Sequence, residues 1–244
     1  MTDQRVAGGG HRRIRALILQ HEEPAPPGIL GDWLDGQGAE LDVFRIDLAE
    51  EVPDARDYDL VATLGSEFAA FDDTKPFVPR EAKLLRQAID ADLPVLGLCF
   101  GSQLLARVLG GRTFRAERPE IGWHNVRTAD PGLVPEGPWF QWHFDTFTLP
   151  PGATLIASSG VGPQAFVSRR NMGLQFHPEV TPEIVEGWVR ASPHDLEGTA
   201  DPELLLEETV RVAPEVRRRA ERLFSTFLKR VALLGSEPAA ETHT

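Results

Sequence analysis

The chain has a single cysteine, Cys99, and its neighbours are those expected around a nucleophile. The residue lies within Gly97-Leu98-Cys99-Phe100-Gly101, where an apolar run ends and a stretch with helical spacing begins. This is the cysteine counterpart of the Gly-x-Ser-x-Gly nucleophile elbow, a strand-to-helix turn whose glycines relieve crowding. Unpaired N–H groups at a helix N-terminus favour a thiolate. The pattern therefore predicts covalent chemistry at Cys99, in preference to an ordinary buried core cysteine.

A cysteine nucleophile needs a base near its sulfur, and His177 is the best placed of the seven histidines. It follows the apolar run 171–176 and precedes Pro178 and Glu179. A strand would carry His177 to the carboxyl edge of a sheet, where sites gather in open α/β proteins. The Glu179 carboxylate can fix the imidazole tautomer and support its charge. The simpler alternatives are a hydrogen-bonded histidine at a strand end and an acidic residue at a helix N-terminus.

The first half of the chain contains the elements that must position these residues. Short apolar runs alternate with segments of helical periodicity, which is typical of a parallel sheet covered by helices on both faces. Strands are predicted at 14–20, 41–46, 58–64 and 94–98, and helices at 28–38, 79–90 and directly after Cys99.

The second half has a different texture, with short strands separated by turn residues. We expect these strands to pair antiparallel, with a tight connection at 171–173. A helix is predicted at 181–191 with Thr181 as its N-cap and a proline at its first position. A charged helical region at 201–234 is expected to break near Pro214. The predicted strands are 112–115, 123–127, 139–142, 154–158, 164–168 and 171–176.

Composition limits the class of protein. The chain has 244 residues, of which 41% are hydrophobic and 25% charged, enough for one sizeable core. One cysteine excludes an internal disulfide and fits a reducing compartment. The formal net charge of −12 argues against a general nucleic-acid binder. No apolar run approaches the length of a membrane span, so we expect a cytoplasmic protein without a membrane partner.

Two segments, Pro94–Ala106 and Gln175–Val180, together resemble the class I (triad) glutamine amidotransferases, and in particular their stand-alone members similar to the glutaminase domain of GMP synthetase and to γ-glutamyl peptidases. The resemblance implies an α/β fold of flavodoxin type, with a mostly parallel central sheet flanked by helices and a smaller antiparallel sheet. It implies a triad of Cys99, His177 and Glu179, with no cofactor and no metal. The reaction implied is cleavage of a γ-glutamyl amide, such as glutamine to glutamate and ammonia, through a γ-glutamyl thioester.

The resemblance also assigns an oxyanion hole. One donor is the backbone N–H of Phe100, directly after the nucleophile, and the second comes from the turn Gly65-Ser66-Glu67. Most relatives have Gly-Gly-Pro at this turn. A backbone N–H survives the change from glycine to serine, so Ser66 can still donate.

Four further residues are assigned to substrate binding by resemblance. Gln103 matches the family's glutamine after the elbow. The stretch His143-Phe144-Asp145 resembles the His-Gly-Asp segment that lines the glutamine pocket of the GMP-synthetase-like members. Phe144 stands where those members have the glycine. This change predicts a reshaped pocket, so free glutamine and a larger γ-glutamyl compound both remain open as the substrate.

The chain is predicted to consist of an amidotransferase domain at 13–192 and a helical C-terminal extension at 193–236 packed on that domain. Flexible tails are expected at 1–12 and 237–244. Three functions remain open: a glutaminase that feeds ammonia to a separate synthetase, a stand-alone γ-glutamyl peptidase, and a non-catalytic module that binds a metabolite or partner.

Overall fold

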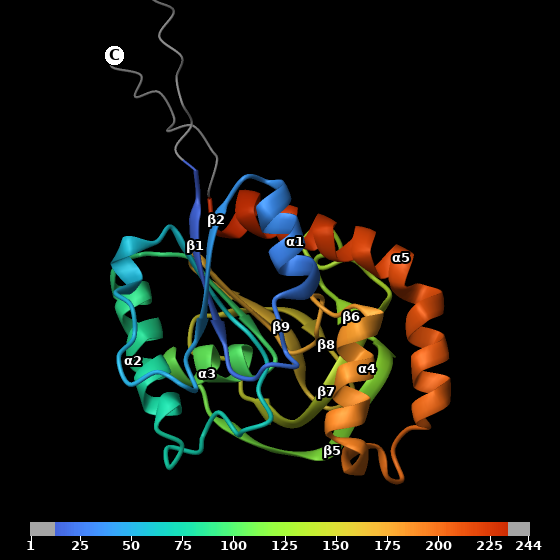
Figure 1. Ribbon diagram of the computed structural model, residues 1–244. Helices are drawn as coiled ribbons and strands as arrows, with labels where there is room; N and C mark the ends of the chain where they lie inside the picture. Colours follow the sequence, from blue (N-terminus) through green and yellow to red (C-terminus); the bar gives the residue numbers. More distant parts are fainter. Residues whose placement is uncertain (1–12, 234–244) are drawn as a thin grey trace, which may run out of the picture.

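The protein is built on an eight-stranded sheet with strand order β2-β1-β3-β4-β10-β9-β8-β6 (Figure 1). The structure is a computed structural model that describes residues 13–233. The predicted tails at 1–12 and 237–244, and residues 234–236 of the predicted extension, lie outside the described residues.

Five neighbouring strands of this sheet are parallel. Their bounds are β2 (Glu40–Arg45), β1 (Arg15–Gln20), β3 (Leu60–Thr63), β4 (Val95–Leu98) and β10 (Asn171–Leu174). The first four confirm the predicted strands of the first half. Because the strands are parallel, their carboxyl ends lie along one edge of the sheet, where a site is expected.

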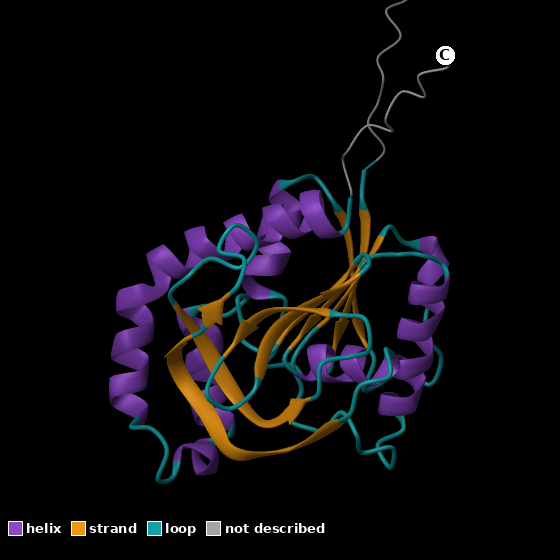
Figure 2. Ribbon diagram, turned by 180° about the vertical axis from the view of Figure 1, so that it is seen from behind, coloured by secondary structure: helices purple, strands orange, loops and turns teal. Residues whose placement is uncertain are grey.

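Helices cover both faces of the sheet, as the alternating pattern predicts (Figure 2). The helices α1 (Gly28–Gly36) and α5 (Pro202–Thr226) pack on one face, through a core that includes Ile18, Leu30 and Phe224. The helices α2 (Phe77–Asp90) and α3 (Phe100–Val108) pack on the other face. The short helices η1 (Ala55–Asp57) and η3 (Phe227–Val231) complete the covering. None of the described helices combines the length and the apolar composition needed to cross a bilayer.

A smaller antiparallel sheet consists of β5 (Thr113–Asn125) and β7 (Pro138–Phe147). It is covered by α4 (Pro182–Ala191) and the short helix η2 (Pro193–Leu196) through a third core cluster that includes Phe140, Val185 and Leu196. The Thr181 hydroxyl accepts from the Ile184 N–H at 3.4 Å, as expected for the predicted N-cap. The predicted combination of a mostly parallel sheet and a smaller antiparallel sheet is therefore confirmed.

The pairing in the second half differs from the expected antiparallel arrangement at one strand. β10 pairs parallel with β4, whereas β9 (Pro163–Ser168), β8 (Thr154–Ser158) and β6 (Arg127–Thr128) extend the same sheet with antiparallel pairing. The predicted tight connection at 171–173 is wrong. The turn is instead at Arg169 and Arg170, and Arg169 takes the positive φ of 54°. The segment 171–174 is fully buried, which suits a central strand and not an exposed turn.

The expected break near Pro214 is also wrong, because α5 continues through it. Pro214 lies on the exposed side of the helix. The carbonyl that its ring deprives of a donor belongs to Val210, whose side chain is 63% exposed, so water can supply the missing hydrogen bond. Figure 1 shows α5 curving from the top of the molecule, near α1, down its right side beside α4. The apolar side of α5 is buried, including Val216, Leu223 and Phe224.

The close packing of β10 on β9 gives a test of the fold. A Cβ at Gly173 would lie 2.2 Å from Cε1 of Phe166, its cross-strand partner. We expect Gly173→Ala to lower the free energy of unfolding by about 1–3 kcal/mol, measured by urea denaturation. The matched control is Gly187→Ala in α4, where a Cβ would meet nothing within 4 Å. It should be neutral or stabilising by up to about 1 kcal/mol, and equal effects of the two changes would contradict the packing argument.

Candidate active site

The turn between β4 and α3 holds Cys99 in a strained backbone conformation. Its φ of 49° is positive, which is rare for a residue with a side chain. A Cβ at Gly97 would lie 2.5 Å from the Gly101 carbonyl oxygen, and one at Gly101 would lie 2.3 Å from the Thr63 carbonyl oxygen. Only glycine fits at both positions. The structure thus supplies the physical reason for the Gly-x-Cys-x-Gly spacing.

The predicted base and its predicted orienting residue are in contact. His177 Nδ1 lies 2.7 Å from Glu179 Oε1, and both side chains are buried. Nε2 of His177 has no hydrogen-bond partner among the described residues. Burial opposes a charge on the ring, but the Glu179 carboxylate and the nearby Cys99 sulfur outweigh it and raise the pKa of His177 to about 10. The imidazole is therefore held as a cation facing the sulfur at neutral pH.

The parallel pairing of β10 with β4 brings these residues together. The Cys99 N–H donates to the Leu174 carbonyl at 2.8 Å, three residues before His177. The His177 N–H donates to the Phe140 carbonyl of β7, also at 2.8 Å. The Trp188 ring of α4 packs edge-on against the imidazole, with 4.8 Å between ring centroids. Both sheets and α4 thus fix the orientation of His177.

The Cys99 sulfur has two polar contacts within the protein. Its Sγ lies 3.8 Å from the Trp142 carbonyl oxygen, and Gln175 Nε2 donates to the sulfur at 3.7 Å. The Gln175 side chain in turn accepts from Gln103 Nε2 at 3.2 Å. Sequence reasoning gave no role to Gln175, although its position two residues before His177 in an extended segment indicates the same face. Gln103 therefore reaches the sulfur through Gln175.

The Gly65-Ser66 turn lies directly beside the sulfur and the imidazole. A Cβ at Gly65 would lie 2.9 Å from Cε1 of His177 and 3.8 Å from Cβ of Cys99. The backbone N–H groups of Ser66 and Phe100, the two predicted oxyanion donors, donate to no other described residue. The turn and the elbow therefore each offer one free backbone donor next to the nucleophile.

A buried ion pair that sequence reasoning missed holds this turn from behind. His21 Nδ1 lies 2.9 Å from the Gly65 carbonyl oxygen, and Nε2 lies 2.7 Å from Glu81 Oε2. Thr63 donates its hydroxyl to the other Glu81 oxygen. Carbonyl and carboxylate oxygens only accept, so both nitrogens of His21 donate and the ring is an imidazolium. Because the C=O and N–H of a trans peptide point in opposite directions, fixing the Gly65 carbonyl also fixes the Ser66 N–H.

A second carboxylate, that of Glu22, contacts the Gly65-Ser66 turn on its cavity side. Glu22 Oε1 accepts from the Ser66 hydroxyl at 2.7 Å and from the Glu67 N–H at 3.1 Å. His21 and Glu22 directly follow β1, and neither lies in a recognisable motif. Their position at the carboxyl end of a parallel strand is the signal that could have identified them.

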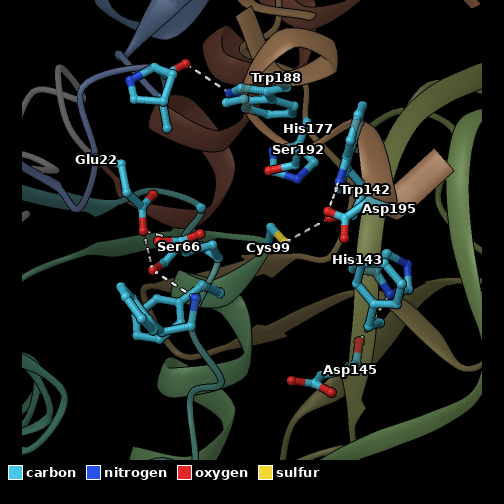
Figure 3. A pocket seen from close by; sticks show the side chains of 18 of the residues that line it. Glu22, Ser66, Cys99, Trp142, His143, Asp145, His177, Trp188, Ser192 and Asp195 are labelled. Atoms are coloured by element: carbon cyan, nitrogen blue, oxygen red, sulfur yellow. Dashed lines mark hydrogen bonds between the residues drawn. The ribbon is translucent and has the colours of Figure 1, made fainter. Parts of the chain in front are cut away.

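These elements enclose a cavity of about 530 Å³ with Cys99 in its wall (Figure 3). The predicted site residues meet there, with the exception of Glu179, which lies behind His177. The cavity-lining residues among them are Gly65, Ser66, Cys99, Phe100, Gln103, His143, Phe144, Asp145 and His177. Their catalytic and binding roles remain predictions.

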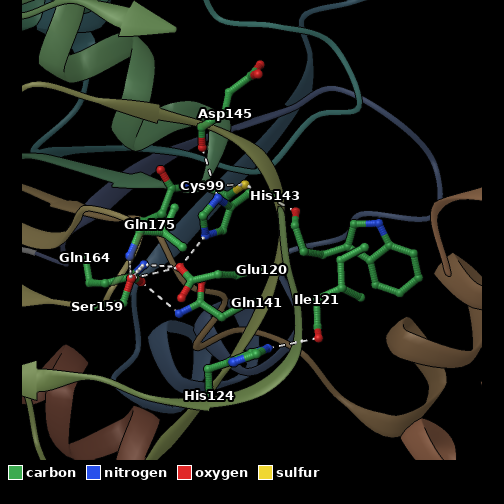
Figure 4. A network of polar contacts seen from close by, with 12 residues as sticks. Cys99, Glu120, Ile121, His124, Gln141, His143, Asp145, Ser159, Gln164 and Gln175 are labelled. Atoms are coloured by element: carbon green, nitrogen blue, oxygen red, sulfur yellow. Dashed lines mark hydrogen bonds and ion pairs between the residues drawn. The ribbon is translucent and has the colours of Figure 1, made fainter. Parts of the chain in front are cut away.

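The stretch 143–145 of β7 is anchored in a polar network between the two sheets (Figure 4). His143 Nδ1 donates to the Asp145 carbonyl at 3.0 Å, and Nε2 lies 3.2 Å from Glu120 Oε2. Glu120 also accepts from Ser159 Oγ at 3.0 Å. The His143 ring is therefore a fixed part of the wall.

The side chains next to His143 present opposite charges to the cavity. Arg115 lies over the Phe144 ring, with its guanidinium carbon 4.6 Å from the ring centroid. Nη1 of Arg115 also lies 3.4 Å from Asp145 Oδ1. Phe144 thus supports the guanidinium of Arg115, and the reshaping of a glutamine pocket by this residue stays a prediction.

Comparison with known proteins defines the class. The model of the family "Glutamine amidotransferase class-I" matches residues 34–186. The chain belongs to the class I glutamine amidotransferase family, a family that includes glutamine-hydrolysing enzymes.

Individual relatives cover most of the chain. It is 29% identical over 198 residues to the glutamine amidotransferase-like protein YfeJ of Salmonella typhimurium, covering 75% of this chain and 83% of that protein. It is 34% identical over 151 residues to one subunit of the glutamine-hydrolysing GMP synthase of Sulfolobus acidocaldarius, covering 57% of this chain and 77% of that one. A glutamine amidotransferase crystal structure from Thermotoga maritima superposes with a TM-score of 0.83 and 31% identity, covering 90% of this chain and all of that one. Other matched GMP synthases are longer, and the chain covers 21% and 34% of two of them.

The His21–Glu81 pair predicts a pH dependence of stability. Burial opposes the charge on His21, but Glu81 outweighs it and raises the pKa of His21 above its usual 6.5. The charged His21 ring therefore makes its full contribution to the free energy of unfolding below about pH 6.5. This contribution is lost as the pH rises through the higher pKa that His21 has in the folded state. We expect His21→Gln to lower the free energy of unfolding by about 3–5 kcal/mol at pH 6. The difference from the wild type should narrow at pH 9 in urea denaturation.

The control for this measurement is Arg217→Gln, which removes an exposed ion pair of 3.0 Å with Asp32. Since the guanidinium stays charged at both pH values, this change should cost less than about 1 kcal/mol at either. A His21→Gln effect of the same size at pH 6 and pH 9 would contradict the buried imidazolium.

Proposed function

We propose that the chain hydrolyses a γ-glutamyl amide through a thioester on Cys99. The observation that carries this proposal is the meeting of three groups: a cysteine at a positive-φ elbow, an imidazole facing it, and a buried carboxylate 2.7 Å from the other imidazole nitrogen. This combination supplies a nucleophile, a proton donor and an orienting acceptor. Membership of the glutamine amidotransferase family supports the same chemistry.

The proposed reaction has two halves. The Cys99 thiolate attacks the side-chain carbonyl carbon and forms a C–S bond, and His177 gives its Nε2 proton to the departing nitrogen as the C–N bond breaks. Water then attacks the thioester carbon, His177 takes a proton from that water, and the C–S bond breaks to release glutamate and the thiolate. Glu179 keeps the imidazole in the tautomer and orientation that both halves need.

Both tetrahedral intermediates carry a negative oxygen. The free N–H groups of Phe100 and Ser66 are the proposed donors to it, and Gly65 gives the turn its close approach to the sulfur. The His21–Glu81 pair then acts as a positioning device for the Ser66 N–H.

The glutamyl end of the substrate is zwitterionic, and we assign it to the charged end of the cavity. Arg115 is placed for the α-carboxylate and Asp145 for the α-ammonium, with Phe144 supporting the guanidinium. Gln103 and His143 hold the wall between this end and Cys99.

The proposal is tested by incubating the purified chain with glutamine and with γ-glutamyl dipeptides and assaying ammonia and glutamate. Glutamate release from either, with labelling of Cys99 by a glutamine-analogue electrophile, supports it. No glutamate from any substrate, and no labelling, would overturn it in favour of a non-catalytic binding module.

The likeness to a GMP synthase subunit of Sulfolobus acidocaldarius supports one variant of the proposal, in which the chain delivers ammonia to a separate synthetase. Glutamine hydrolysis that appears only after a second protein is added would establish this variant. Full activity of the isolated chain would favour a stand-alone hydrolase.

Substitution of the nucleophile gives a direct prediction. We expect Cys99→Ser to lower kcat by about 10³-fold or more, because a serine hydroxyl is far less acidic than a thiol. The side chain volume changes little, so the melting temperature measured by circular dichroism should stay close to that of the wild type. Retention of turnover in this variant would remove Cys99 from the mechanism.

Substitution of Glu179 predicts a change in pH dependence. Because its carboxylate is one of two groups that raise the pKa of His177, Glu179→Gln should move the alkaline limb of kcat/KM to lower pH. We also expect kcat to fall by about 10²- to 10⁴-fold. The control is Glu183→Gln in the first turn of α4, which is exposed and outside the cavity. A lower kcat with an unmoved limb would show that Glu179 acts only on the fold.

A further inference from the structure

The cavity extends beyond Cys99 to a wall built by residues outside the segment shared with the family. That segment ends at residue 186 and begins at residue 34. Trp188 of α4, Asp195 of η2 and Ser192 between these two helices lie after it, and Glu22 lies before it. We call these four residues, together with Trp142 from within the matched segment, the distal wall.

The distal wall lies on the side where the leaving nitrogen departs. Trp188 packs directly on His177, the proposed proton donor to that nitrogen, with 4.8 Å between ring centroids. Figure 3 shows Trp188 and Ser192 on the side of His177, and Asp145 on the opposite side of Cys99. Since the glutamyl part is assigned to the end with Asp145, the other part of the substrate must extend toward the distal wall.

The polar groups of the distal wall favour a cation. Asp195 Oδ2 accepts from Trp142 Nε1 at 2.9 Å, which fixes the carboxylate at the cavity, and its side chain is 21% exposed. Among the described residues, the Glu22 carboxylate accepts only from the Ser66 hydroxyl and the Glu67 N–H. Burial raises the pKa of the Glu22 carboxyl, and a cation bound beside it would oppose this shift and keep the carboxylate charged.

Aromatic faces add to this preference. The Trp142 and Trp188 rings lie 6.0 Å apart at an interplanar angle of 79°, and indole is the strongest aromatic partner of an ammonium group. Among the described residues that line the cavity there is no lysine, and the single arginine, Arg115, belongs to the glutamyl end. The imidazolium of His177 is the proposed donor that gives its proton to the leaving nitrogen. His194 Nε2 lies 3.4 Å from Asp195 Oδ1, and its side chain is 75% exposed at the rim.

We propose that the distal wall binds the amine half of the substrate, and that this amine carries a second, positively charged group. The substrate class is then the γ-glutamyl amide of a diamine, and the inference rests on the γ-glutamyl hydrolysis proposed above. Ammonia would contact almost none of this wall. The cavity volume of about 530 Å³ lies in the range that encloses drug-sized ligands, which are larger than free glutamine.

The test compares γ-glutamyl amides whose amines match in length and differ in charge. The probes are the γ-glutamyl amides of diaminobutane, butylamine and aminobutyrate, together with glutamine, and the readout is glutamate release. We expect kcat/KM to fall in the order diaminobutane, butylamine, aminobutyrate, with about tenfold or more between the first and the last. Glutamine should be a poorer substrate than the diaminobutane amide.

The role of the carboxylate is tested with Asp195→Asn, which removes the charge and keeps an oxygen for Trp142 Nε1. We expect it to lower the ratio of kcat/KM for the diaminobutane amide over the butylamine amide by about tenfold, the effect of one partly screened charge pair. Asp130→Asn is the matched control. Asp130 pairs with Arg230 at 2.6 Å and is not a cavity residue, so the ratio should not change.

The outcomes separate this inference from the function on which it rests. Glutamine hydrolysis with a flat or reversed order of the three amides would overturn the inference and leave the proposed function in place. An unchanged ratio in Asp195→Asn would remove Asp195 from substrate selection and also overturn it. Failure to hydrolyse any of the four compounds would overturn both.

Discussion

The geometry of the site depends on the parallel pairing of β10 with β4. One hydrogen bond of 2.8 Å, from the Cys99 N–H to the Leu174 carbonyl, joins the end of one strand to the end of the other. It brings together an elbow and an imidazole that are far apart in the sequence. Gly97 and Gly101 allow the elbow to pack closely on itself and on Thr63, and Gly173 allows β10 to pack on Phe166 of β9, because a Cβ at any of them would overlap a neighbour. The arrangement of the site residues therefore depends on close packing at the edge of the sheet.

The sequence was sufficient to predict those parts of the fold and of the site that a local pattern defines. The strands of the first half, the helices α1 to α4 and the meeting of Cys99 with His177 and Glu179 all follow from apolar runs, glycine spacing and a two-residue offset. The pairing of β10 did not follow, because a short buried strand gives no sign of its partner's direction. Nor did the continuity of α5 at Pro214, since it depends on which side of the helix faces water.

The groups that sequence reasoning missed share one property, which is that their role exists only in three dimensions. His21 and Glu81 are separated by 60 residues, and each alone is an ordinary polar residue in an apolar setting. Their pairing supports the Gly65 carbonyl from within the core. Trp188 lies in a predicted helix and Asp195 in the predicted helical extension, and neither was given a role in the site. The elbow was thus visible in the sequence, whereas its supports and its distal wall were not.

The near-complete burial of Cys99 also governs its redox chemistry. The residue is 4% exposed, and its sulfur is reached through a cavity walled by tryptophans and carboxylates. The same cavity is the path by which a small oxidant such as peroxide would reach the sulfur and form a sulfenic acid. With no second cysteine in the chain to resolve a sulfenic acid, recovery from oxidation depends on a reductant small enough to follow the same path.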